Sequence, residues 1–195
     1  TVECVRKLRQ RCDGKLLISW THFQGGLDAL SAIRTPQKLL EDLILCPDDV
    51  KRALRQIDQA IDDARRAFAQ ELDAATWGTW TRHGMYSTGL VDIPQCDFSA
   101  MIGPDMFREF GLPSLAHECD MLDAAEYHLD GPDAIKHLPA IAEIKAIHLI
   151  QWQPGAGAAA VKDWTDLYRQ IDQLGLGQIR QGTRQQALDL WQHVQ

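Results

Sequence analysis

One stretch of the chain, residues 127–133, constrains the fold more than any other, because a strand there runs straight into a helix. Side chains alternate along a strand, so His128 and Asp130 lie side by side on one face. Pro132 and Asp133 then start the helix, since proline fits the first helical turn and an acid there meets the positive end of the helix dipole. A strand that ends in polar groups and opens a helix is the unit with which (β/α) barrels build active sites.

A purely structural interpretation of the same residues is also open. Asp130 can serve as the N-cap of the following helix, where its carboxylate accepts a hydrogen bond from a free backbone N–H. His128 can be a hydrogen-bonded core residue rather than a ligand or a proton donor. The residues alone do not choose between the structural and the functional interpretation.

Strand-like and helix-like segments alternate along the rest of the chain, which predicts a parallel sheet covered by helices. The predicted strands are residues 15–20, 75–80, 126–129, 147–152 and 178–180. An eight-stranded barrel typically needs about 250 residues, and the chain has 195. We therefore predict a single α/β domain over residues 1–195, an incomplete (β/α) TIM-type barrel of about five strand–helix units.

The predicted helices lie between these strands, and several start at prolines. They are residues 4–12, 36–45, 104–122, 134–144, 159–174 and 183–194, with one long helix that starts at Pro47. In the long helix apolar residues recur at spacings of three, four and seven, which predicts an amphipathic helix whose charges, among them Asp62 and Arg65, face solvent. Pro113 lies inside the helix predicted over 104–122, and we expect a bend there because an interior proline costs roughly 3 kcal/mol.

Charge and cysteine content exclude several classes of function. The chain has 20 basic and 27 acidic residues, and the basic ones are scattered, which argues against a nucleic-acid surface. No apolar run approaches the ~18 residues of a membrane span, and no signal peptide is visible. The five cysteines form no CxxC pair, so neither a disulfide framework nor a zinc ribbon is expected. These features predict a cytoplasmic protein with a small-molecule substrate, and the start at Thr1 suggests a piece of a longer protein.

Three segments resemble the uroporphyrinogen decarboxylase superfamily. They are YHLDG at 127–131, IHLIQW at 147–152 and CDFSAMIGPDMFREFGLP at 96–113, and residues 39–52 are similar to the segment before the family's long helix. The resemblance covers the chain from about residue 15 to residue 177 and matches the later part of the family's (β/α)8 barrel. The family includes porphyrinogen decarboxylases and methyltransferases that move a methyl group between a corrinoid protein and a thiol. The resemblance therefore implies a pocket at the carboxyl ends of the strands.

The sequence departs from both branches of this superfamily. The decarboxylases use an aspartate for the pyrrole nitrogens and arginines for the substrate carboxylates, in an early part of the family sequence that has no counterpart here. Asp97 falls where a later serine of theirs would be. The methyltransferases hold zinc with a His-x-Cys pair and a later cysteine, whereas this chain has His128-x-Asp130 and no cysteine after Cys119. Oxygen in place of sulfur implies a weaker zinc site or none.

Two hypotheses follow for function. The first is an enzyme with a decarboxylase-like or methyltransferase-like site, in which His128 or Asp97 is the proton donor or a metal ligand and Asp130 orients or co-ligates. The cofactor expected in such a site is zinc, held by His128 and Asp130. Residues 77–86 would form an aromatic wall that excludes water, and the predicted pocket residues are Cys96, Gln151, Trp152, Trp80 and Tyr86. The second hypothesis is an inactive piece of a barrel that self-associates.

An incomplete barrel also predicts self-association. Five parallel strands cannot close, so two sheet edges and an inner apolar face around Leu17, Leu149 and Ile150 would face water. A soluble monomer rarely exposes an apolar face larger than several hundred Å². We therefore expect a homodimer or higher oligomer that buries roughly 2,000 Å² or more at its interface.

Overall fold

A four-stranded parallel sheet is the centre of the structure, a computed structural model that describes residues 2–19, 21–157, 162–180 and 182–193. The strands, in their order across the sheet, are β3 (Val91–Asp92), β4 (Ala124–Asp130), β5 (Ile147–Gln153) and β6 (Gly177–Ile179). Every neighbouring pair is parallel. The predicted α/β fold with a parallel sheet is therefore confirmed. A closed barrel is not present among the described residues.

The β4–β5 ladder sets the positions of the polar residues. His128 lies opposite Gln151, and Leu129 lies opposite Trp152. The segment after β3 continues along β4, because Gln95 forms a parallel bridge with His128. Since side chains alternate along each strand, His128 and Gln151 share one face of the sheet, and Leu129 and Trp152 share the other.

The face that carries Leu129 packs into the hydrophobic core. Tyr127, Leu129 and Ile150 are almost completely buried, in one cluster with apolar residues of α8 (Leu138–Ile141) and α10 (Thr165–Gln173). Full burial of such side chains stabilises the fold by roughly 1.5–3 kcal/mol each. The sequence predicts that Ile150 lies on an apolar face exposed to water. This prediction is wrong, because Ile150 lies opposite Tyr127 on the face that packs into the core.

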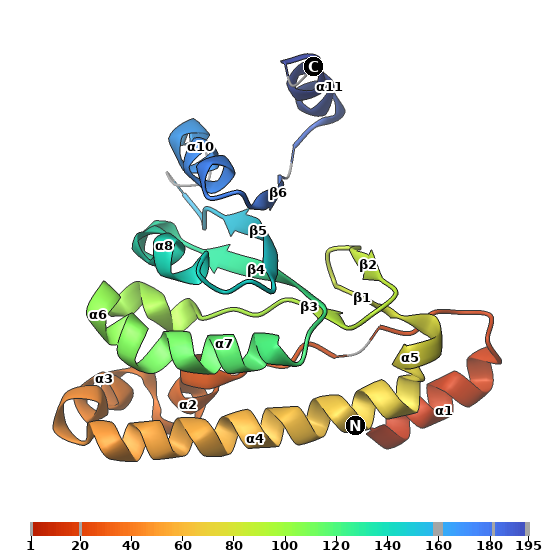
Figure 1. Ribbon diagram of the computed structural model, residues 1–195, viewed down its shortest axis with the longest axis horizontal. Coiled ribbons are helices and arrows are strands. Elements are labelled where there is room, and N and C mark those ends of the chain that lie inside the picture. Colours follow the sequence, from red (N-terminus) through yellow and green to blue (C-terminus); the bar gives the residue numbers. More distant parts are fainter. Residues whose placement is uncertain (1, 20, 158–161, 181, 194–195) are drawn as a thin grey trace.

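A layer of helices lies below the sheet in Figure 1, and its longest member is α4 (Pro47–Leu72). α7 (Leu112–Asp120) lies between α4 and the sheet, and α1 (Val2–Cys12) lies along one end of α4. α2 (Gly26–Arg34) and α3 (Pro36–Leu45) pack at the other end. The helices predicted in these regions are confirmed, except that α2 has no counterpart in the sequence prediction.

The helix predicted over 104–122 is continuous from 104 to 120 but contains a π-helical turn just before Pro113. The segment consists of α6 (Pro104–Met106), a π-helical turn η2 (Phe107–Gly111) and then α7. The N–H of Leu112 donates to the carbonyl of Phe107, five residues back, so the wider turn is complete before the proline, which has no N–H to donate. A single π turn of this kind is a usual way to accommodate an irregularity within a helix.

The helices of the second half are shorter than predicted. Residues 134–144 hold the end of the 3-10 helix η3 (Pro132–His137), followed by α8. α10 covers the later part of the helix predicted over 159–174, and residues 158–161 lie outside the described ones. α11 (Arg184–His193) stands away from the rest of the molecule (Figure 1). Within the described ranges, no helix has both the length and the apolar character of a membrane span.

The strand predicted over 75–80 is wrong for most of its length. The segment is the short helix α5 (Ala74–Trp77), followed by β1 (Thr79–Trp80), which forms an antiparallel hairpin with β2 (Tyr86–Ser87). Gly78 makes the sharp turn between α5 and β1, with a φ of +70°. A Cβ at this position would lie 2.1 Å from the carbonyl oxygen of Ser87, so only glycine fits.

The strand predicted over 15–20 is not found in residues 15–19, and Trp20 lies outside the described part of the chain. The hairpin of β1 and β2, rather than residues 15–19, lies against the β3 edge of the sheet. The N–H of Val91, in β3, donates to the hydroxyl of Thr79 at 2.7 Å. That hydroxyl donates in turn to the carbonyl of Gly89 at 2.9 Å.

Two charged residues of α4 are buried, contrary to the predicted solvated face. Arg65 and Asp62 are 1% and 5% exposed. Arg65 donates to the carboxylate of Asp92, in β3, at 2.9 Å, and also to that of Glu118, in α7. This buried ion network joins the long helix to the sheet and to α7.

Candidate functional site

Three of the predicted site residues converge at the carboxyl end of β4. His128 and Asp130 belong to β4, and Asp97 is the first residue of η1 (Asp97–Met101), the 3-10 helix that follows β3. Each offers one ligand atom, and these atoms all lie within 4.8 Å of one another. All three residues are half-buried, so the cluster is partly shielded from water but remains accessible.

The local sequence explains this convergence. Parallel strands present their carboxyl ends at one edge of the sheet, where ligands of α/β proteins bind. The N–H of His128 donates to the carbonyl of Pro94 at 3.1 Å, and this bond holds the segment after β3 against β4 just before Asp97. Alternation along β4 then places Asp130 on the same face as His128.

Gln151 determines which nitrogen of His128 carries the proton. Gln151 donates its side-chain N–H to the carbonyl of Trp152 at 3.1 Å, so its Oε1 is the atom that accepts a hydrogen bond from Nδ1 of His128. A neutral imidazole with its proton on Nδ1 has a lone pair on Nε2. A ring held in this way is the usual arrangement of a metal-binding histidine.

Asp97 has one paired and one unpaired oxygen. Its Oδ2 accepts a hydrogen bond from the side chain of Gln95 at 3.0 Å, whereas its buried Oδ1 has no hydrogen-bond partner among the described residues. Burial, reinforced by the carboxylates of Asp28 and Asp130, raises the pKa of Asp97 to about 6. Buried polar atoms normally have a partner, so a proton or a cation would complete this site.

A second polar pair lies beside this cluster. Glu126, on the same face of β4 as His128, is 1% exposed. The hydroxyl of Thr81 donates to its Oε2 at 3.2 Å, and its Oε1 pairs with Nδ1 of His83, in the hairpin loop. The ring centroids of His83 and His128 are 6.3 Å apart. This pair is not predicted from the sequence. Glu126 could have been found, because it lies two residues before His128 and therefore on the same face of the strand. No feature of the sequence pointed to His83.

Two predicted pocket residues face away from the cluster. Trp152 lies on the core face of the sheet, where its ring packs edge-on against Trp164 at a centroid distance of 4.9 Å. Cys96 is buried in the core, and burial raises the pKa of its thiol well above the usual value, which makes it unreactive. The structure brings Gln151 to the cluster, through its contact with His128.

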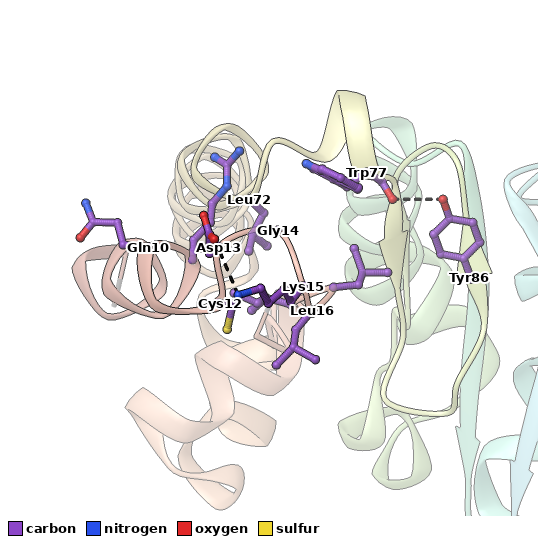
Figure 2. Close-up of a pocket in the computed structure, with 12 residues that line it drawn as sticks. Gln10, Cys12, Asp13, Gly14, Lys15, Leu16, Leu72, Trp77 and Tyr86 are labelled. Atoms are coloured by element: carbon purple, nitrogen blue, oxygen red, sulfur yellow. Dashed lines mark hydrogen bonds and ion pairs between the residues drawn. The ribbon is translucent and has the colours of Figure 1, made fainter.

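The predicted aromatic wall lies apart from the cluster. Tyr86 is 56% exposed and donates its hydroxyl to the carbonyl of Trp77 at 3.0 Å. Figure 2 shows these two residues and Leu16 around a groove of about 530 Å³ between the hairpin and the segment after α1. Trp80 borders a different and much smaller cavity, of about 30 Å³, together with His22.

An open pocket of about 420 Å³ borders Asp97. Its walls come from α2, the segments on either side of α2 and both ends of η1, and they include Asp28, Ser31, Phe98 and Met101. Pockets of this size hold small ligands. Asp97 therefore belongs both to the cluster and to the wall of this open pocket, which His128 and Asp130 do not line.

No protein-family model, curated protein or solved structure matches the chain. The chemistry of the site therefore rests on its own atoms. One imidazole nitrogen and two carboxylate oxygens are a donor set that zinc, manganese and iron accept. The directed ring of His128 and the three ligand atoms within 4.8 Å of one another fit such an ion. Three protein ligands also leave a position open for water or substrate, as catalytic sites require.

Proposed function

We propose that Asp97, His128 and Asp130 bind a divalent cation, and that this centre belongs to a metal-dependent enzyme similar to the methyl-transferring branch of the uroporphyrinogen decarboxylase superfamily. The observation that carries the proposal is the convergence of three ligand atoms within 4.8 Å of one another. Exposed acidic groups often gather without an ion. This cluster differs because it is half-buried and holds an oriented histidine and an unpaired carboxylate oxygen.

The three residues have distinct roles in this proposal. His128 offers Nε2, and Gln151 holds its ring in place. Asp97 and Asp130 each offer one carboxylate oxygen, and together they balance the charge of the cation. The cation would supply a Lewis acid next to the pocket that borders Asp97. Because oxygen ligands suit zinc less well than thiolates do, we expect weaker zinc binding than at a cysteine site.

A second candidate function is proton transfer without a metal, as in a decarboxylase-like enzyme acting on a small carboxylic acid. The observation that favours it is the pKa of Asp97, which burial raises to about 6. A carboxyl group with this pKa can hold and release a proton near neutral pH. Asp97 would then donate the proton that replaces the departing CO₂ on the substrate carbon, and the cluster would bind no cation.

Metal analysis separates these functions. We expect protein purified without added metal to contain a divalent cation, or to bind one equivalent of Zn²⁺ or Mn²⁺ in a calorimetric titration. His128→Ala removes a ligand and Asp130→Asn removes the charge of one, so each should weaken binding by more than the roughly 10–100-fold lost when a residue that only supports a ligand is replaced. If the wild-type protein binds none of these cations, the proposal is contradicted. The remaining hypotheses would then be a proton-transfer enzyme or an inactive piece of a barrel.

His148→Ala is the matched control for His128→Ala. His148 is an exposed residue of β5 whose ring bonds the carbonyl of Ala146 at 2.6 Å. Its replacement should leave cation binding unchanged. The melting temperature of His128→Ala should fall only modestly, through the loss of the hydrogen bond to the buried Oε1 of Gln151. If His128→Ala instead lowers the melting temperature strongly while the cation still binds, His128 is a structural residue.

A further inference from the structure

Asp28, in α2, reaches across the fold to the backbone of the candidate site. Its Oδ2 accepts a hydrogen bond from the N–H of Asp97 at 2.9 Å, and its Oδ1 accepts one from the N–H of Phe98 at 2.8 Å. Gln24 also donates its side-chain N–H to Oδ2, at 3.4 Å. Asp28 is only 6% exposed, so its carboxylate depends on these protein donors rather than on water.

These contacts hold the start of η1. The first N–H groups of a helix have no partner within the helix, and Cys96, the residue before η1, provides no side-chain cap. The carboxylate of Asp28, which precedes Asp97 by 69 residues in the sequence, provides the missing hydrogen-bond acceptors. Because its two oxygens bind consecutive N–H groups, they fix the position and orientation of the Asp97 backbone, and therefore the direction in which the Asp97 side chain leaves it.

The charge of Asp28 also acts on the cluster. Serine or asparagine would cap a helix start without adding charge, whereas the carboxylate of Asp28 acts electrostatically on that of Asp97, as Asp130 does. Like charges in a partly buried region repel one another. A divalent cation held by Asp97 and Asp130 would leave the three carboxylates with a single net negative charge, and so would relieve most of this repulsion.

We propose that Asp28 is a positioning residue of the metal centre: it holds the backbone of Asp97 so that the Asp97 carboxylate meets His128 and Asp130. Asp28 does not bind the cation itself. The inference rests on the proposed function. It extends the centre to α2, whose residues carry no strand-end or metal-binding pattern in the sequence.

Asp28→Asn tests this role, because asparagine has nearly the same shape but only one acceptor oxygen, so that its amide group faces a backbone N–H. We expect the variant to bind Co²⁺ roughly 10–100-fold more weakly, as is typical when a residue that holds a metal ligand in place is replaced. The visible absorption of the bound Co²⁺ should also change, because the ligand geometry changes. Asp62→Asn makes the same change at a buried acid of α4; it is the matched control and should leave affinity and spectrum unchanged.

A purely structural cap predicts a different outcome. Asp28→Asn would then lower the melting temperature but leave Co²⁺ affinity and spectrum as in the wild type, and that result would overturn the proposal. If Asp28→Asn does not fold, Asp28→Glu takes its place, because it keeps the charge but displaces the carboxylate. The same loss of affinity is expected from it.

Backbone hydrogen exchange tests the contact without any metal. The amides of Asp97 and Phe98 should exchange slowly in the wild type and faster in Asp28→Asn. If the wild-type protein binds no Co²⁺, the proposed function fails, and a change in exchange would then show that Asp28 holds η1 for another purpose. Equal exchange in both proteins would refute the positioning role itself.

Discussion

Glu118, in α7, shares the guanidinium of Arg65 with a second carboxylate, that of Asp92. Arg65 donates to Asp92 at 2.9 Å and also to Glu118, while Asp58, in α4, adds further negative charge nearby. Burial raises the pKa of Glu118 to about 7, in spite of the opposing effect of Arg65. Protonation of Glu118 leaves Arg65 and Asp92 as a balanced pair.

We predict that this residue makes the chain less stable as the pH rises. The pKa of Glu118 is higher in the folded chain than its usual 4.5, so its contribution to the free energy of unfolding is complete below pH 4.5 and is lost as the pH rises through about 7. At about 1.4 kcal/mol per pKa unit, the loss is on the order of 3 kcal/mol. Glu118→Gln cannot ionise and should lack this part of the pH dependence.

Denaturant unfolding of both proteins at pH 5 and pH 8 measures the difference. Asp97, whose pKa is also raised, is present in both, so the comparison isolates Glu118. Parallel pH profiles for the wild type and Glu118→Gln would show that Glu118 keeps its charge throughout.

Single residues show where sequence reasoning succeeds and where it stops. His128, Asp130 and Gln151 could be placed on one face because alternation along a strand is a local property. Arg65 could not be placed, because it lies in a helix rich in charges and its two partners are 27 and 53 residues away. The buried role of Glu126 likewise depends on a hairpin that the sequence does not reveal.

Among the elements, length decides what can be predicted. α4, β4 and β5 follow a periodic pattern for long enough to be recognised in the sequence. β1 and β3 have two residues each, and strands this short depend on their partners rather than on their own composition. Short strand length explains both failures of prediction: β3 is not predicted at all, and the strand predicted over 75–80 is placed too early and made too long.

Gly111 ends the π-helical turn where the packing leaves no room for a side chain. An added Cβ would lie 2.7 Å from Cδ2 of Phe107 and 3.3 Å from Cδ1 of Leu27, and both residues are almost fully buried. Helix propensity favours alanine over glycine by roughly 1 kcal/mol, but overpacking a core typically costs ~1–3 kcal/mol. We predict that Gly111→Ala lowers the free energy of unfolding by about 1 kcal/mol.

Urea unfolding of Gly111→Ala beside Gly103→Ala tests this balance. A Cβ at Gly103, just before α6, would meet nothing within 4 Å, so Gly103→Ala should change stability little. If Gly111→Ala is more stable than the wild type, propensity outweighs packing at the π turn.

The whole molecule presents an open sheet edge and a groove in which apolar side chains are exposed between polar ones. β6 forms one edge of the sheet among the described strands. Leu16 and Trp77, which line the groove in Figure 2, are 68% and 48% exposed. The edge and the groove are surfaces that self-association would cover.

We therefore predict a homodimer or higher oligomer with the groove, rather than the polar face of the sheet, in its interface. Sedimentation at micromolar concentration should show the oligomer. Leu16→Asp should dissociate it while the single chain keeps its helix and strand content by circular dichroism, since Leu16 is already exposed in the single chain. Ile33→Asp, at a position of α2 that is 76% exposed, is the control and should leave the oligomer intact. A stable wild-type monomer would refute self-association.

Anomalous diffraction from crystals soaked in Zn²⁺, recorded on both sides of the zinc absorption edge, tests the proposed metal centre most directly. We predict one strong peak about 2.0–2.2 Å from Nε2 of His128 and from one carboxylate oxygen of Asp97 and of Asp130. The absence of a peak at this position, or a peak held instead by Glu126 and His83, would contradict the proposal that these three residues form the metal centre.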